Sequence, residues 1–190
     1  MDGRRTDTRQ RIRAVAIELF TEQGYDRTSM REIAERVDVT KAALYYHFPT
    51  KQDIVDDLFA AVPDGIEEIV EWARTQPPGP RTRDAILVRY GRLLHDVGRD
   101  LARFFYTNQT TFSRHPSAIT MREGLQLLTE QMIKPDHQAR NAFRARQALL
   151  MIGWSSSMMG DLDLTDEECF EAALPLARTV LSGIVEPGEL

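Results

Sequence analysis

The stretch "SMREIAERVDVTKAALYYHFPTK", Ser29 to Lys51, decides the fold of the N-terminal part of the chain. It opens with Ser-x-x-Glu, the capping-box pattern that begins a helix. Apolar residues then recur on one helical face, at Met30, Ile33, Ala34 and Val37. Thr40 can N-cap a second short helix that continues through Phe48. Two short helices joined by about three residues are a helix-turn-helix candidate.

The second helix combines aromatic side chains with flanking lysines, since Tyr45, Tyr46, His47 and Phe48 stand between Lys41 and Lys51. A buried segment excludes the lysines and a purely solvated face excludes the rings. A recognition helix in the DNA major groove uses both kinds of residue, because its first residues contact base edges while other side chains donate to phosphates.

The positions along this helix suggest roles for its side chains. Its first residues, at the base edges, are Thr40, Lys41, Ala42 and Ala43. The ammonium of Lys41 can donate to guanine, and the small alanines allow contact with a thymine methyl. Tyr45 and His47 can donate to phosphate oxygens, and Lys51 can do so from the first turn of the next helix. Leu44 and Phe48 are expected to face the core.

Composition limits the class of protein. The 190 residues carry a net charge of −5, yet residues 1–51 hold ten Lys and Arg against eight carboxylates. A basic head on an acidic body fits a nucleic-acid-binding module. No run approaches 18 apolar residues, so we expect no membrane span. A single cysteine, Cys169, excludes an internal disulfide and favours a soluble cytoplasmic protein in which it is a small core residue.

The rest of the chain is also helical in pattern, and the predicted fold class is all-α. The first helix carries Ile12, Val15, Ala16, Leu19 and Phe20 on one face and ends at Gly24. A break is expected at Pro63–Gly65 and a loop at "TQPPGPRT", residues 75–82. Helical stripes then recur as far as a second capping box, "TDEE", at residues 165–168.

At this point the N-terminal part resembles a known family. The segment "AIELFTEQGYDRTSMREIAERVDVTKAALYYHFPTKQDIV" lies within residues 9–55, which look like the DNA-binding domain of the TetR (tetracycline-repressor) family of transcriptional regulators. The turn position that is commonly glycine in that family is Asp38 here, a residue that tolerates the left-handed conformation. The resemblance implies phosphate contacts from Thr28, Tyr45, His47 and Lys51. It implies base contacts from Lys41, Ala42 and Ala43, which Arg31 and Thr40 can join.

The resemblance also implies that the chain has two domains with different functions. Residues 1–51 would form a three-helix helix-turn-helix DNA-binding domain, and residues 52–190 a larger helical domain for ligand binding and dimerisation. The last two helices, roughly 140–159 and 167–184, would form the homodimer interface, bent by Pro175. A dimer also follows from physics, because one recognition helix reads few base pairs and two-fold symmetry doubles the site on a palindrome.

A pocket is harder to locate from the sequence. The central helices are rich in aromatic residues and methionine, which suits an apolar or aromatic effector held by a few polar groups. The same residues can equally be core packing. The candidate ligand-binding residues are Tyr90, Phe104, Phe105, Asn108, Phe112, Met121, Trp154 and Met158.

The sequence therefore predicts a ligand-responsive repressor that binds double-stranded DNA at a palindromic operator. It has no glycine-rich phosphate loop, nucleophile elbow or paired metal-ligand motif, so neither an enzyme nor a metal or other cofactor is expected. An enzyme is the main alternative of another class, and these absences argue against it. A third interpretation is a helical module that binds protein through "LYYHF" and has no role with DNA. Salt dependence separates protein binding from DNA binding, because DNA binding weakens steeply as counterions are released.

Overall fold

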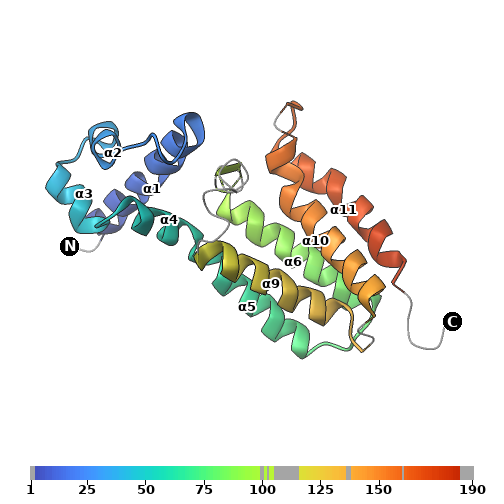
Figure 1. Ribbon diagram of the computed structural model, residues 1–190. Helices are drawn as coiled ribbons and strands as arrows, with labels where there is room; N and C mark the ends of the chain where they lie inside the picture. Colours follow the sequence, from blue (N-terminus) through green and yellow to red (C-terminus); the bar gives the residue numbers. More distant parts are fainter. Residues whose placement is uncertain are drawn as a thin grey trace.

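The computed structural model describes residues 3–98, 101, 103–104, 116–135, 138–159 and 161–184, and the regular structure in these ranges is helical. Figure 1 shows two groups of helices, a smaller one made of α1 to α4 and a larger one made of α5 to α11. The all-α prediction is confirmed. None of the described helices is both long and apolar enough to cross a membrane.

The first group consists of α1 (Gly3–Gln23), α2 (Met30–Val37), α3 (Lys41–His47) and α4 (Lys51–Phe59). Side-chain oxygens begin three of these helices. Ser29 and Glu32 form the expected capping box, and Thr40 accepts a hydrogen bond from the Ala43 N–H at 3.1 Å. A further capping box joins Thr50 to Asp53 at the start of α4, which sequence reasoning did not find. Each of these N-caps begins a new helix after a short turn.

The small domain has its own hydrophobic core. The expected stripe of α1 points into it, and Phe20 is 1% exposed. α4 contributes as well, since Ile54 and Val55 are fully buried there. The division drawn after Lys51 remains a proposal, but this core extends past that point to Phe59.

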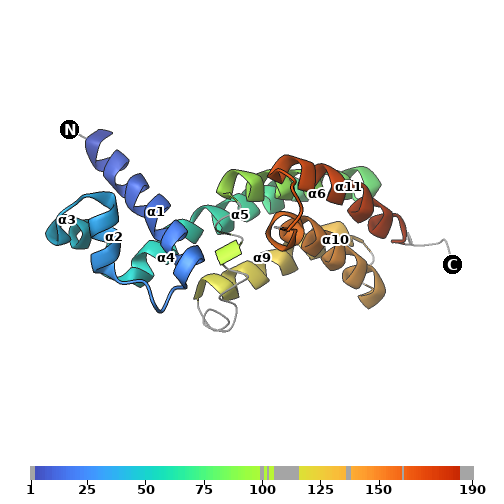
Figure 2. The same cartoon turned by 90° about the horizontal axis from the view of Figure 1, so that it is seen from above.

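The larger group consists of α5 (Ala61–Arg74), α6 (Pro80–Val97), α9 (Pro116–Met132), α10 (Ala139–Met158) and α11 (Asp166–Ser182). Seen from above, α6 and α11 lie on one side of this bundle and α9 and α10 on the other (Figure 2). The second core is buried between them, with Leu87, Leu128 and Leu149 each 0% exposed. Cys169 is buried at 4% exposure near the start of α11, as expected.

The break between α4 and α5 lies earlier than predicted. It was expected at Pro63–Gly65, but α5 runs through these residues and the two helices separate at Ala60. Pro63 falls in the first turn of α5, where a missing N–H costs no hydrogen bond. The proline ring instead conflicts with the carbonyl four residues earlier, at Phe59, which is the last residue of α4.

Candidate nucleic-acid interface

The helix α3 has one buried and one exposed face. Leu44 is 0% exposed and Phe48, at its C-terminal cap, is 1% exposed, so both hold the helix on the small core. Tyr45 is 49% exposed and Tyr46 is 66% exposed. Thr40, Lys41 and Ala42 are exposed at its N-terminus, and Ala43 is half-buried. The expected division between core and outward-facing residues is therefore confirmed.

The turn between α2 and α3 is fixed by main-chain geometry. Asp38 adopts the left-handed conformation, with φ 60° and ψ 52°, as its place at the family's glycine position predicted. Its N–H donates to the carbonyls of Ala34 and Glu35. A guanidinium N–H of Arg11 donates to the Val37 carbonyl at 2.6 Å, so α1 also holds the end of α2. These hydrogen bonds fix the turn after α2 and therefore the orientation of α3 relative to α2.

Arg9 fastens α1 to the helices on either side of it. Its guanidinium lies over the Phe48 ring, 4.7 Å from the centroid, and donates to an Asp57 carboxylate oxygen at 2.6 Å. The hydrogen bond to Asp57 raises the pKa of Arg9. Because Arg9 is both stacked on Phe48 and paired with Asp57, it stabilises the fold and is not available to bind a ligand.

Lys51 is also tied to the protein, which the sequence did not reveal. Its ammonium donates to the main-chain carbonyls of Thr28, at 2.8 Å, and Tyr25, and lies over the Tyr25 ring. Partial burial lowers the pKa of Lys51, with nearby Asp26 opposing the shift. An ammonium has three N–H donors and two are occupied, so one is left for a phosphate.

Thr28 differs from its expected role. It is only 2% exposed, and its hydroxyl donates to the Gly24 carbonyl at 2.9 Å. A phosphate contact from this hydroxyl would require breaking a buried hydrogen bond. The residue instead closes the turn between α1 and α2, where Lys51 also binds.

The remaining expected contacts are exposed or partly so. Arg31 forms a surface ion pair with Glu35 at 2.7 Å, and such a pair opens at little cost. His47 is half-buried, and the Tyr46 ring stands edge-on to it with 5.6 Å between centroids. Sequence reasoning did not assign Tyr46 to the site, although its place beside Tyr45 on an otherwise polar helix end was a usable signal.

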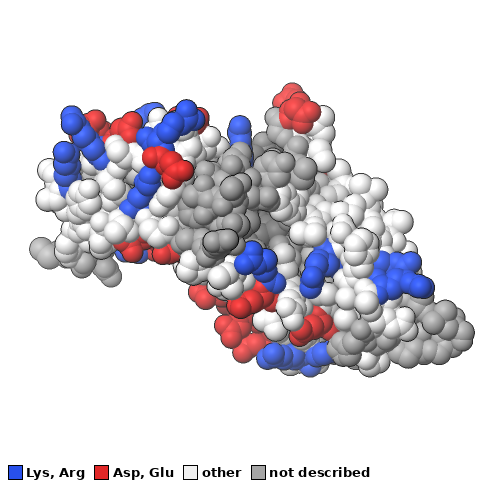
Figure 3. Space-filling model, in the orientation of Figure 1, with Lys and Arg blue, Asp and Glu red and all other residues white. Residues whose placement is uncertain are grey.

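Charge is distributed unevenly over the molecule. In Figure 3, Lys and Arg side chains stand over the part of the surface formed by α1, α2 and α3. The surface over α5 is mainly acidic, because that helix carries Asp64, Glu67, Glu68 and Glu71. Asp and Glu side chains stand among these cations in the same view, so the surface over α1 to α3 is of mixed charge, whereas that over α5 is mainly acidic.

The candidate ligand residues do not gather in one place. Tyr90 is 3% exposed in the second core, and Met121 and Trp154 are partly buried. Phe104, by contrast, is 0% exposed in the first core, where its ring lies 5.4 Å from that of Phe20. It therefore belongs to the core of the small domain and not to a pocket in the large one. Phe105, Asn108 and Phe112, and the side chain of Met158, lie outside what the structure describes.

No metal centre is formed within the described ranges, where no three His, Cys, Asp or Glu side chains come together to hold an ion. His95 is an exposed residue of α6 and lies 3.8 Å from Glu167 on α11. What the described residues do form is a capped helix-turn-helix whose second helix presents rings, a lysine and small side chains outward. It is followed by a separate helical domain. This arrangement defines a protein with a helix-turn-helix domain.

Comparison with known proteins agrees with that class. Residues 12–58 match the family described as "Bacterial regulatory proteins, tetR family". The N-terminal domain therefore belongs to the TetR family. The HTH-type transcriptional regulator AcrR of Shigella flexneri is 37% identical over 73 residues, which are 38% of this chain and 34% of that protein. The negative transcriptional regulator IcaR of Staphylococcus aureus is 42% identical over 55 residues, 29% of this chain and 30% of that protein.

The match to these curated relatives spans about a third of their length. Both relatives are named as transcriptional regulators and not as enzymes. Solved structures extend the likeness of fold over the whole chain. PfmR of Thermus thermophilus superposes with a TM-score of 0.71 at 20% identity, covering 92% of this chain and 99% of that one. AmtR of Mycobacterium smegmatis superposes with a TM-score of 0.63 at 23% identity, covering 94% of this chain and 96% of that one.

Proposed function

We propose that the protein is a homodimeric transcriptional repressor that binds a palindromic DNA operator and releases it when a small apolar or aromatic effector binds. The observation that carries the proposal is the two-faced helix α3, with Leu44 and Phe48 buried and its N-terminal residues exposed. IcaR is named a negative regulator, which favours repression over activation. Because its partner is chromosomal DNA, a bacterial protein of this kind acts in the cytoplasm.

The exposed residues divide into two sets of proposed DNA contacts. Thr40, Lys41, Ala42 and Ala43 enter the major groove and contact base edges. Arg31, Tyr45, Tyr46 and His47 contact phosphates and fix the register. Lys51 and Thr28 mainly stabilise the DNA-binding domain, because the hydrogen bonds of Lys51 to the turn before α2 hold α2 and α4 together.

A dimer through α10 and α11 is supported by apolar side chains that the single chain leaves in water. Phe143 of α10 is 67% exposed and Leu176 of α11 is 59% exposed. Gln147, Leu150 and Trp154 continue the Phe143 face at helical spacing and are half-buried. Large exposed apolar residues on two adjacent helices are typical of a protein interface. A second copy would bury them and place two α3 helices on one DNA.

An effector site in the large domain is supported by Tyr90. Its side chain is 3% exposed in the second core. Burial raises the pKa of this phenol, so it stays neutral and able to donate. An effector with one hydrogen-bond acceptor and an apolar body would meet this hydroxyl and the apolar side chains around it, such as Met121, which packs against the same core.

The repressor would work by a shift between two conformations. An effector that binds the DNA-incompetent conformation more tightly lowers the affinity for the operator, and by linkage the operator lowers the affinity for the effector. The two cores meet at Val97, which packs against both, so motion of α6 reaches the DNA-binding domain.

The test is selection of genomic DNA fragments by the purified protein, followed by sequencing. The variant Lys41→Ala, Tyr45→Ala removes two outward side chains of α3 without touching its buried face. Arg81→Ala, an exposed cation on α6, is the matched control. The proposal predicts a palindrome that is enriched by the wild type and the control and lost by the double variant. A palindrome recovered equally well by the double variant, or no enrichment at all, would refute it.

The alternative is that α3 binds another protein through its exposed rings. Counterion release makes DNA binding fall by about a thousandfold or more between 50 and 200 mM salt for several phosphate contacts. An apolar contact made by Tyr45 and Tyr46 would change little over that range. Measuring retention of DNA fragments at several salt concentrations separates the two.

A further inference from the structure

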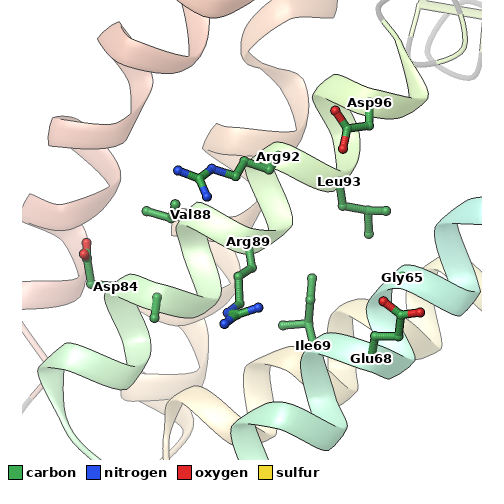
Figure 4. Close-up of a pocket in the computed structure, with 10 residues that line it drawn as sticks. Gly65, Glu68, Ile69, Asp84, Val88, Arg89, Arg92, Leu93 and Asp96 are labelled. Atoms are coloured by element: carbon green, nitrogen blue, oxygen red, sulfur yellow. The ribbon is translucent and has the colours of Figure 1, made fainter.

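A trench lies on the outside of the large domain, between α5 and α6 (Figure 4). Its volume is about 550 Å³, which is the size of a small-molecule site. Tyr90, Phe104, Met121 and Trp154, the expected ligand residues whose side chains are described, do not line it, and Tyr90 faces the core instead. The trench is therefore separate from the effector site proposed above.

Two arginines of α6, Arg89 and Arg92, line the trench one helical turn apart. The guanidinium of Arg89 lies over the Trp72 ring, 4.1 Å from the centroid, which holds it in place without using its N–H donors. Arg92 makes no side-chain hydrogen bond or ion pair with the residues that the structure describes. A stacked guanidinium with unused N–H donors is already oriented to form a bidentate pair with a carboxylate.

Several other arginines of the chain are already paired with a carboxylate. Arg9, Arg31 and Arg178 are each paired with a carboxylate at 2.5 to 2.7 Å. Arg89 and Arg92 have no such partner among the described residues, and neither does Glu68, which lines the same trench from α5.

The walls between the charges are apolar. Ile69, Val88 and Leu93 line the trench, and Leu93 packs so closely on Gly65 that a Cβ at that glycine would lie 2.3 Å from its Cδ1. An occupant therefore meets a hydrocarbon surface next to two guanidinium groups. Three acids also line the trench. Asp84 is paired with Arg178 on α11, and Glu68 and Asp96 would repel a second negative charge.

We propose that this trench binds a small organic monocarboxylate, with its carboxylate on Arg89 and Arg92 and its apolar body on Ile69, Val88 and Leu93. The acids select against dicarboxylates. A ligand here touches both α5 and α6 and would restrain their relative motion. That regulatory consequence rests on the proposed function, whereas the binding itself does not.

The test uses hexanoate and its neutral counterpart hexanamide, with dissociation constants measured by ligand-observed NMR on the full chain without DNA. Hexanoate should bind in the millimolar range and hexanamide at least about tenfold more weakly, because it cannot form charge-assisted hydrogen bonds. Arg89→Gln and Arg92→Gln should each weaken hexanoate binding by about tenfold. Arg81→Gln, an exposed arginine of α6 outside the trench, should not.

Adipate tests the role of the acids. It should bind more weakly than hexanoate, and Glu68→Gln should narrow that difference. The proposal is overturned if hexanoate does not bind, if hexanamide binds equally well, or if Arg89→Gln and Arg92→Gln behave like Arg81→Gln. Because no DNA is present, failure here leaves the DNA-binding proposal standing, and failure of DNA selection leaves this one standing.

Discussion

Replacing Phe104 with alanine tests whether this residue belongs to the core of the small domain. The ring is 0% exposed and lies among Phe20, Tyr25 and Phe59, with centroid distances of 5.4 to 6.4 Å. Deleting a buried phenylalanine ring costs about 3–5 kcal/mol, since it removes apolar burial and leaves a cavity. For a chain of this size each kcal/mol lowers Tm by about 2–4 °C, so the expected fall is about 6–20 °C.

The assay is thermal unfolding followed by circular dichroism, with urea unfolding to obtain the free energy. Leu162→Ala is the matched control, because Leu162 is 47% exposed and its loss should change the unfolding free energy by less than about 0.5 kcal/mol. Phe104→Ala should also weaken DNA binding near its lowered Tm, because the missing ring supports α1. A loss of stability below about 1 kcal/mol would show that Phe104 is not packed in this core and would refute the reasoning.

Three further predictions follow from local features. Asp38→Gly should stabilise the chain by about 0.5–1 kcal/mol in urea unfolding, because glycine adopts the left-handed conformation freely, and a loss of stability would contradict this. Thr165→Ala should cost about 1 kcal/mol at pH 7. The hydrogen bonds from the Thr165 N–H and hydroxyl lower the pKa of Glu168. The stability difference between the wild type and Glu168→Gln should therefore be present above the unfolded pKa of Glu168 and be lost as pH falls through its lowered folded-state pKa. A difference that persists in acid would contradict this. Phe143→Glu should convert the dimer to a monomer in sedimentation velocity, and an unchanged dimer would place the interface elsewhere.

The helices of the DNA-binding domain could be predicted because their signals are local. A capping box at Ser29, an apolar stripe and the alternation of Leu44 and Phe48 with outward residues each depend on near neighbours in sequence. The box at Thr50 was missed because its third residue is Asp53 and not the usual glutamate or glutamine. An error of this kind changes the predicted start of one helix and leaves the predicted fold unchanged.

The internal roles of Lys51 and Thr28 could not be predicted in the same way. Lys51 donates to the carbonyl of a residue 23 positions earlier, and that partner is a main-chain atom with no mark in the sequence. Phe104 illustrates the same limit for apolar residues. Its type indicated burial, but periodicity does not say which of two cores a side chain enters.

The central claim is that the exposed face of α3 binds DNA, and its most direct measurement is the salt dependence of affinity for the fragment that selection recovers. Fluorescence anisotropy would compare the wild type with Tyr45→Phe, which keeps the ring and removes one hydroxyl donor. If Tyr45 contacts a phosphate, the variant should bind more weakly at every salt concentration, with specificity for the palindrome unchanged. Equal affinity of the wild type, Tyr45→Phe and the Lys41→Ala, Tyr45→Ala double variant would contradict the claim.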